Sequence, residues 1–598
     1  IILPNKKRTL SMLSAELLQN IAIARIVLFG TVGMLTILAF LTTRKTRDAI
    51  NGVSTPHRDH LWVWAGAIGL AWSLGAAAIL LPAHTLLWGN QGDETFQIAF
   101  MEKVISGHPF SDFFYANLSP FYPPLYFWIF GTLGRIFNWD GISAAQWGTL
   151  ITYALLPLVA VLFAKICRWT FQEQKVALLL SIGTLLFLPT EALLLKPYEA
   201  AAALFSVLWI YAFIKLLKEP SWGLRIILGI SGGIIFLLYY FWFVLLIPAM
   251  IGLILSSRRQ EGSPWWIPHY VRNDMRSFIT IGIITTFVAS PFLIPYLYDL
   301  ITLGQQNYQS VYFFPSDAHL YAPWFSYTFA GLLTIGSIIT YIARKSWSDA
   351  QKATLAITGS IMLWHFVQLI VLATGGKSVM LSKPFLFLGG VALMLPAIEW
   401  IGEWINAGCR LARLEFIDSR KVLIASIIIF APLLPNGLFL DDTKIQAQLE
   451  QNLLSRTSSF VAENIRVFVP DYAQRTWLVS GLQDLNGILP ITHYLAWNPH
   501  FSHPAAHWGT RLNELERISK LTTANEVTQS FDALGINALL LYRATDENGN
   551  AYYPFFYEED AWPNGTESKK LRFDEKLINL ENWQVVHEDN EWRVLLRK

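Results

Sequence analysis

Charged residues are scarce in this chain. Only 15% of its 598 residues are Asp, Glu, Lys or Arg, whereas soluble domains carry about 25%. The deficit is confined to residues 1–440, because residues 441–598 hold 37 charges in 158 positions. This composition excludes a wholly soluble protein. It predicts a membrane-embedded body over 1–440 and a soluble domain of ordinary size over 441–598.

Cysteine is almost absent. Cys167 and Cys409 both end apolar runs beside basic residues, and no Cys-x-x-Cys spacing occurs, so neither a disulfide nor a zinc site is predicted. The chain also lacks a phosphate-binding P-loop, a dinucleotide glycine fingerprint and a Gly-x-Ser-x-Gly elbow. No basic stripe suggests a nucleic-acid partner. The sequence therefore shows no nucleotide-binding site, and energy or an activated sugar must come from elsewhere.

Long apolar runs, in contrast, are abundant. A helix needs about 20 apolar residues to cross a bilayer. The run 224–256 is too long for one straight span and contains Gly232, Gly233 and Pro248, so we expect two short or broken crossings there. The total is about twelve helices, within a range of about 11–13, which predicts an α-helical polytopic membrane protein. The other candidate spans are 21–42, 61–82, 146–167, 176–195, 198–218, 277–299, 324–343, 353–374, 385–402 and 422–440.

Basic residues recur on alternate loops, which the positive-inside rule assigns to the cytoplasm. The remaining loops are then external. This pattern predicts a multi-pass plasma-membrane protein, in contact with membrane lipids, whose C-terminal domain is extracytoplasmic. The loops predicted to be external are 83–145, 195–197, 300–323 and 375–384, together with the whole of 441–598.

The external segment 83–145 is expected to hold two interfacial helices. Residues 93–107 place Phe96, Ala99, Phe100 and Val104 at helical spacing, with polar residues elsewhere, which is typical of an amphipathic helix. A second apolar helix is expected to begin after Pro123-Pro124, because proline suits a first turn.

Asp93 and Glu94 follow Gly92 at the start of the first of these helices. A carboxylate at a membrane boundary can serve as a general base. The alternative is a helix N-cap, since Asp is favoured there for accepting backbone N–H bonds. Adjacent carboxylates do not face each other on a helix, so only one is expected to point into a site.

Lys196 precedes Pro197, Tyr198 and Glu199 in a very short external turn. Charges this close to hydrocarbon are costly and often functional. Lys196 could bind a lipid phosphate, helped by the adjacent helix N-terminus; the alternative is a lysine that extends to the headgroups. Both interpretations also apply to the external lysines Lys377 and Lys383.

Two further regions are rich in aromatic residues and histidine. The loop 299–324 contains His319 among tyrosines and phenylalanines, a composition that suits a lid. In the tail, strand-like runs at 476–479 and 538–542 and two closing strands within 583–597 indicate an α/β domain. Its histidines match no metal-ligand template, so the milder interpretation is a sugar-binding or docking surface. These are His493, His500, His503 and His507.

Two motifs carry a resemblance to a known family. Residues 119–128, Ser-Pro-Phe-Tyr-Pro-Pro-Leu-Tyr-Phe-Trp, resemble the proline-aromatic motif of the actinobacterial galactan arabinofuranosyltransferases. The turn Lys196–Glu199 falls where that family has a similar tyrosine-glutamate turn. These enzymes belong to the GT-C-type glycosyltransferases, which take sugars from polyprenyl phosphates. Pro124-Leu125 depart from the smaller residues expected there.

The resemblance implies an inverting transfer of arabinofuranose from decaprenyl-phosphoryl arabinose to cell-wall galactan on the external face. It implies that Asp93 is the catalytic base and Glu94 a supporting residue. Lys196, then Lys377 or Lys383, would stabilise the leaving phosphate. No metal is required, although a divalent cation is left open. The sugar and the acceptor would be bound by Tyr122, Tyr198, Glu199 and His319.

Two alternatives stay open at this point. Another lipid-linked sugar transferase, such as a mannosyltransferase, shares every feature except the narrow motif. A transporter or flippase would explain the spans, but such proteins usually show repeats and place ionisable groups at mid-membrane.

Overall fold

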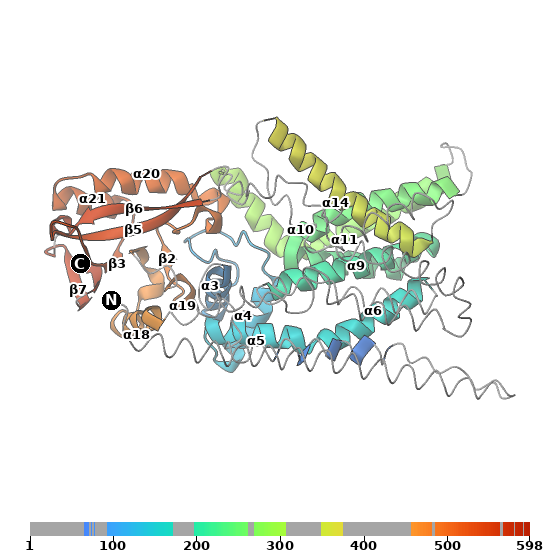
Figure 1. Cartoon of the computed structure of the whole chain (residues 1–598), viewed down its shortest axis with the longest axis horizontal. Coiled ribbons are helices and arrows are strands. Elements are labelled where there is room, and N and C mark those ends of the chain that lie inside the picture. Colours follow the sequence, from blue (N-terminus) through green and yellow to red (C-terminus); the bar gives the residue numbers. More distant parts are fainter. Residues whose placement is uncertain are drawn as a thin grey trace, which may run out of the picture.

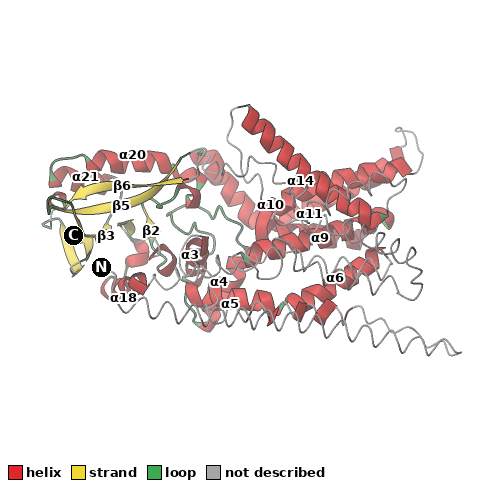
Figure 2. Cartoon of the chain, in the orientation of Figure 1, coloured by secondary structure: helices red, strands yellow, loops and turns green. Residues whose placement is uncertain are grey.

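The computed structural model describes residues 93–171, 196–260, 268–306, 348–374 and 456–598, apart from 481–484, 562–565, 579 and 590, together with parts of a helix between 62 and 77. A body built of helices is joined to a C-terminal domain that holds all the described strands (Figures 1 and 2). The expected fold class, a mostly helical chain with a C-terminal domain that contains strands, is therefore confirmed over these residues. The domain boundary predicted at residue 440 lies outside them.

Four helices are long and apolar enough to cross a membrane, or up to five if one bent pair is counted as a span. They are α9 (Pro197–Lys218), α10 (Trp222–Gln260), α11 (Pro268–Leu303) and α14 (Asp349–Ala373), and the pair α5 (Gly141–Ala154) and α6 (Leu156–Phe171), bent by 42°. These helices agree with five of the predicted runs. The predicted spans 21–42, 176–195, 324–343, 385–402 and 422–440 lie outside the described residues, and 61–82 is described only in part.

Helix α10 is broken at Tyr239, where φ is −164° and ψ is 97°. The indole N–H of Trp209 donates to the carbonyl of Leu228 at 2.8 Å, and the same ring lies 6.1 Å from that of Phe243. An unbroken helix would place Leu228 and Phe243 about 22 Å apart. The chain therefore bends sharply at Tyr239, and both arms of α10 contact α9.

The expected interruption of this run is confirmed, but its expected position is wrong. Pro248 lies within a helical stretch. The glycines instead allow α10 and α11 to approach closely: a Cβ at Gly229 would lie 2.5 Å from Cβ of Ile284, and one at Gly233 would lie 2.5 Å from Cβ of Val288. Small residues commonly permit such contacts between membrane helices.

The two expected helices of segment 83–145 are present as α3 (Asp93–Ile105) and α4 (Leu125–Phe137). The prediction that α3 is an amphipathic helix with an exposed polar face is wrong. Every residue of α3 from Glu94 to Val104 is buried, including Gln97, Glu102 and Lys103. The reason is that α3 is enclosed by α4, α5 and the short helix α19 (Leu485–Ile488) of the C-terminal domain. On the side predicted to be exposed, Oε1 of Glu102 accepts a hydrogen bond from the backbone N–H of Gly141 in α5 at 2.8 Å.

The C-terminal domain contains a five-stranded sheet in the order β2-β1-β3-β8-β7 and a three-stranded sheet in the order β4-β5-β6. The strands predicted at 476–479 and 538–542 are confirmed as β1 and β3, a parallel pair, and the closing strands as β7 and β8. The strands are β1 (Thr476–Val479), β2 (Thr492–His493), β3 (Ala538–Tyr542), β4 (Ala544–Thr545), β5 (Ala551–Asp560), β6 (Thr566–Asp574), β7 (Trp583–Glu588) and β8 (Trp592–Arg597).

Helices cover these sheets, and their apolar faces form the core of the domain. Leu512 and Leu515 of α20 and Phe531 of α21 pack in one cluster with residues of both sheets, such as Leu539 and Tyr553. The helices are α18 (Arg456–Phe468), α19, α20 (Trp508–Ser519) and α21 (Ala524–Ala533). The short 3-10 helices are η6 (Tyr472–Gln474), η7 (Pro499–Phe501), η8 (Pro504–Ala506) and η9 (Glu575–Leu577).

The C-terminal domain is docked on one end of the helical body (Figure 1). The backbone N–H of Gln306, just beyond α11, donates to the carbonyl of Pro504 at 2.9 Å, and that of His493 donates to Phe114 at 2.7 Å. Lys215 and Lys218 lie at the other end of α9 from Lys196. The domain therefore sits against the helix ends that the basic loops predict to be external.

Candidate active site

Asp93 and Lys196 meet at the end of the body that faces the C-terminal domain. Asp93 is the first residue of α3, and Lys196 is the N-cap of α9, directly before Pro197. The Nζ of Lys196 lies 2.5 Å from Oδ2 of Asp93 and 3.7 Å from Oε1 of Glu199. The side chains of Asp93 and Lys196 are 31% and 23% exposed, whereas that of Glu199 is completely buried. Asp93 and Lys196 are thus partly accessible at the surface, and Glu199 lies buried beneath them.

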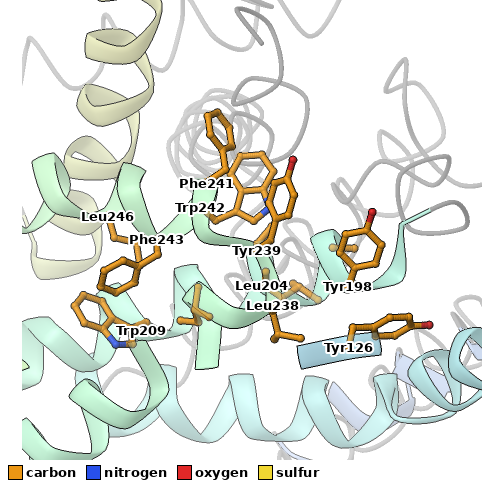
Figure 3. Close-up of a cluster of buried hydrophobic side chains, with 14 of the residues drawn as sticks. Tyr126, Tyr198, Leu204, Trp209, Leu238, Tyr239, Phe241, Trp242, Phe243 and Leu246 are labelled. Atoms are coloured by element: carbon orange, nitrogen blue, oxygen red, sulfur yellow. The ribbon is translucent and has the colours of Figure 1, made fainter. Parts of the chain in front are cut away.

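Tyrosines surround the buried carboxylate of Glu199. The hydroxyl of Tyr122 donates to Oε1 of Glu199 at 3.4 Å and lies 2.9 Å from the hydroxyl of Tyr198. Tyr239, at the bend of α10, also hydrogen-bonds Glu199. From the same bend, Nε1 of Trp242 donates to the backbone carbonyl of Glu199 at 3.1 Å. Figure 3 shows Tyr239 and Trp242 together at the bend, with Tyr198 on the neighbouring helix.

These surroundings determine the charge state of the site. Burial lowers the pKa of Lys196, but the nearby carboxylates of Asp93 and Glu199 more than offset it and raise that pKa above its ordinary value. Lys196 is therefore charged at neutral pH. Burial, and next the neighbouring Tyr198 and Glu199, raise the pKa of Tyr122 well above its ordinary value, so its hydroxyl keeps its proton and can donate it.

The proline-aromatic segment holds Tyr122 in place. Ser119, at its start, donates from its backbone N–H and its hydroxyl to Oδ2 of Asp299 in α11, at 2.8 and 2.6 Å. The ring of Tyr122 lies 4.7 Å from that of Phe96, one turn after Asp93. Pro124 is the N-cap of α4, and the last residues of the motif form the first turn of that helix. Tyr122 is thus fixed between the α11 anchor and the first turn of α3.

The C-terminal domain also reaches this site. Phe501, buried in the body core, lies 5.5 Å from Phe96 between ring centroids. Its neighbour His500 is held by its own backbone N–H, which donates to the Asn498 side chain at 2.8 Å. Burial lowers the pKa of His500 to about 3, and Asp93 and Lys196 act on it electrostatically. A neutral imidazole therefore lies near the ion pair.

This arrangement offers a carboxylate base, a cation suited to an anionic leaving group and hydroxyl donors behind them. Among the described residues, no group of three His, Cys, Asp or Glu side chains could hold a metal ion.

The family model described as "Arabinofuranosyltransferase N terminal" matches residues 15–396. The chain belongs to this family. It is similar to the galactan 5-O-arabinofuranosyltransferase of Mycobacterium tuberculosis (strain ATCC 25618 / H37Rv), with 21% identity over 528 residues, which cover 84% of this chain and 79% of that protein. The protein of the same name from Mycobacterium leprae (strain TN) is 21% identical over 520 residues, covering 82% and 79%.

The arabinofuranosyltransferase family assignment makes the chain a glycosyltransferase and decides against the transporter alternative. The expected GT-C-like fold class, with a sheet-containing C-terminal domain, is likewise confirmed.

Most of the predicted site residues of this arabinofuranosyltransferase come together. The structure gathers Asp93, Lys196, Tyr122, Tyr198 and Glu199 into one cluster. Tyr198 and Glu199 are completely buried in this conformation, so their role in sugar binding stays a prediction.

The structure describes only one of the four remaining predicted residues. Glu94 is buried within α3. Lys377, Lys383 and His319 lie outside the described residues. Sequence reasoning placed His500 only in a docking or sugar-binding patch, and it did not single out Tyr239. The one signal for Tyr239 was its place in an apolar run too long for a single span.

Proposed function

We propose that this protein transfers arabinofuranose from decaprenyl-phosphoryl arabinose to cell-wall galactan, with inversion, on the external face of the plasma membrane. The observation that supports it most directly is the Asp93–Lys196 pair, at 2.5 Å, beside the N-terminus of a membrane helix. The names of the two mycobacterial relatives support the sugar and the acceptor.

Each step of the transfer has a residue suited to it. An acceptor hydroxyl has a pKa far above neutral, so an inverting displacement needs a positioned base, and Asp93 is partly exposed. The departing lipid phosphate needs positive charge, which Lys196 and the N-terminus of α9 supply. The hydroxyl of Tyr122 donates a hydrogen bond to the buried carboxylate of Glu199 and holds it beside Lys196.

The external location is supported by the arrangement of the helices. Asp93, Lys196 and the docked C-terminal domain share one end of the body, and the basic residues that end α9 lie at the other. Basic loops generally face the cytoplasm, and this rule supports a reaction on the external side.

Purified protein in detergent, incubated separately with decaprenyl-phosphoryl arabinose and decaprenyl-phosphoryl mannose, tests the proposal. A galactan oligomer serves as the acceptor, and each reaction is run with a divalent cation and with a chelator. We expect the oligomer to gain arabinofuranose and no mannose. Transfer of mannose alone would establish the mannosyltransferase alternative, and no transfer from either donor would contradict the proposed function.

A further inference from the structure

Lys196 lies between two carboxylates in different surroundings. Its Nζ is 2.5 Å from Oδ2 of Asp93, which is partly exposed, and 3.7 Å from Oε1 of Glu199, which is completely buried. Tyr122 and Tyr239 hydrogen-bond Glu199, so the buried carboxylate is held in place. The contact with Asp93 joins two helices, whereas the contact with Glu199 lies within the first turn of α9. The second contact can therefore persist when the first is broken.

The transfer reaction moves one negative charge across this site. The acceptor oxygen forms a bond to the anomeric carbon, and its proton passes to Asp93. The bond from that carbon to the phosphate oxygen breaks, and its electron pair stays with the phosphate. Asp93 thus goes from charged to neutral while the lipid phosphate gains one negative charge. The total charge of the site is unchanged, but the best partner for Lys196 changes from Asp93 to the phosphate.

We propose that Lys196 couples these two events: it pairs with Asp93 in the resting enzyme and passes to the phosphate as Asp93 takes the proton. This inference rests on the proposed function and adds to it a role for Glu199, which keeps Lys196 within reach of both partners. Before transfer, the ion pair with Asp93 competes with the phosphate for Lys196. During transfer, protonation of Asp93 releases the lysine when the leaving group needs it.

The competition has a consequence that an independent phosphate-binding lysine would not produce. Replacing Asp93 by Asn removes this ion pair and leaves only Glu199, at 3.7 Å, to compete with an anion for Lys196, so the inactive variant should bind a lipid phosphate more tightly than the wild type. A partly exposed ion pair contributes at most about 1 kcal/mol, which corresponds to a gain of about fivefold in affinity. The gain should require Lys196.

A double-mutant cycle on binding tests this inference. Decaprenyl phosphate, which carries no sugar, is titrated into the full-length wild type, Asp93→Asn, Lys196→Met and the double variant, all in detergent. Asp140→Asn is the matched control, because Asp140 is an exposed N-cap at the start of α5 and its replacement keeps the capping group. Thermal unfolding checks that each variant is folded, and Lys196→Gln replaces Lys196→Met if the latter is not.

We expect Asp93→Asn to bind about fivefold more tightly than the wild type, Asp140→Asn to bind like the wild type, and the gain from Asp93→Asn to disappear in the Lys196→Met background. An equal gain in both backgrounds would mean that Asp93 only repels the phosphate, and no gain would mean that the ion pair does not restrain Lys196; either result overturns the inference. Since the probe lacks a sugar, binding can be measured even if the transfer assay shows that the proposed donor is wrong, so the two failures are distinguishable.

Discussion

The hydroxyl of Tyr115 and that of Ser502 lie 2.7 Å apart and are both buried, although they are 387 positions apart in the chain. Tyr115 lies between α3 and α4, and Ser502 lies directly after η7 of the C-terminal domain. The Tyr115 hydroxyl also accepts a hydrogen bond from the backbone N–H of Ala496 at 3.2 Å. The C-terminal domain is therefore docked on the segment that joins α3 and α4, through buried polar groups that hydrogen-bond each other across the interface.

Replacing Tyr115 by Phe should weaken this docking. The variant leaves Ser502 and the N–H of Ala496 without a partner, and a buried polar group that loses its partner costs about 1–3 kcal/mol. We expect a lower midpoint of thermal unfolding and a loss of transfer. Tyr552→Phe is the control, since the Tyr552 hydroxyl is 3.4 Å from Nζ of Lys570 within the C-terminal domain. An equal loss in both variants would show that the effect does not come from docking.

A second contact between the body and the C-terminal domain should depend on pH. Burial raises the pKa of Glu102 from 4.5 to about 7, although the backbone N–H of Gly141, at 2.8 Å, and the charge of Arg466 in α18 both lower it. A raised carboxyl pKa means that the folded state binds the proton more tightly than the unfolded state. Stability should then fall as the pH rises from about 4.5 to about 7 and level off above that.

The Glu102→Gln variant should remove most of this dependence, because the amide stays neutral and its oxygen can still accept from Gly141. The difference between the two proteins should be on the order of 3 kcal/mol above pH 7 and vanish near pH 4.5. Thermal unfolding of the wild type and the variant between pH 5 and 8 measures it. Asp112, whose pKa burial also raises to about 7, should leave a residual slope in the variant. Parallel curves would contradict the assignment to Glu102.

The parts of the site that could be predicted are those encoded by short stretches of sequence. Asp93 and Tyr122 lie at or just before the N-terminus of a helix. Lys196 and Glu199 lie in one turn between two apolar runs. Local rules for helix ends and membrane boundaries are enough to select them. Their meeting between α3, α9 and the segment before α4 follows from tertiary packing, which the spacing of the residues does not encode. Their grouping into one site was predicted from the resemblance to a family.

Other features depend on packing that no local pattern encodes. The bend of α10 falls at Tyr239, a residue that forms helices adequately, and not at the glycines, which pack against α11. The polar residues of α3 suggested an exposed face because the covering surface, α19 and α18 with Arg466, is far away in sequence. His500 reaches the site only because the C-terminal domain docks.

Labelling of single cysteines tests the sidedness of the site. Glu547 lies in an exposed turn of the C-terminal domain, and Glu219 is exposed where α9 ends. In intact cells, an impermeant maleimide should label Glu547→Cys but should label Glu219→Cys only after lysis. The parent protein, with Cys167 buried, measures the background. The reverse pattern would place both the domain and the Asp93–Lys196 pair in the cytoplasm and would remove the basis for external transfer.

The identity of the base is tested by Asp93→Asn. Asparagine has nearly the same shape and is a comparable helix-capping residue, so expression and thermal unfolding should stay close to those of the wild type. Removing a general base typically costs about 10²–10⁴-fold in rate, and we expect a loss of this size in transfer to galactan.

Two other carboxylates of the same segment serve as comparisons for Asp93. Oδ1 of Asp112 accepts from the backbone N–H groups of Phe114 and Tyr115, both at 2.8 Å, and Glu94 is buried within α3. The Asp112 contacts need only one acceptor oxygen, which the amide of asparagine also supplies, so we expect Asp112→Asn to fold and to keep much of the transfer activity. We expect Glu94→Gln to lose less activity than Asp93→Asn. An active Asp93→Asn beside an inactive Asp112→Asn or Glu94→Gln would move the base to another carboxylate. Activity in all three variants would show that none of these groups removes the acceptor proton.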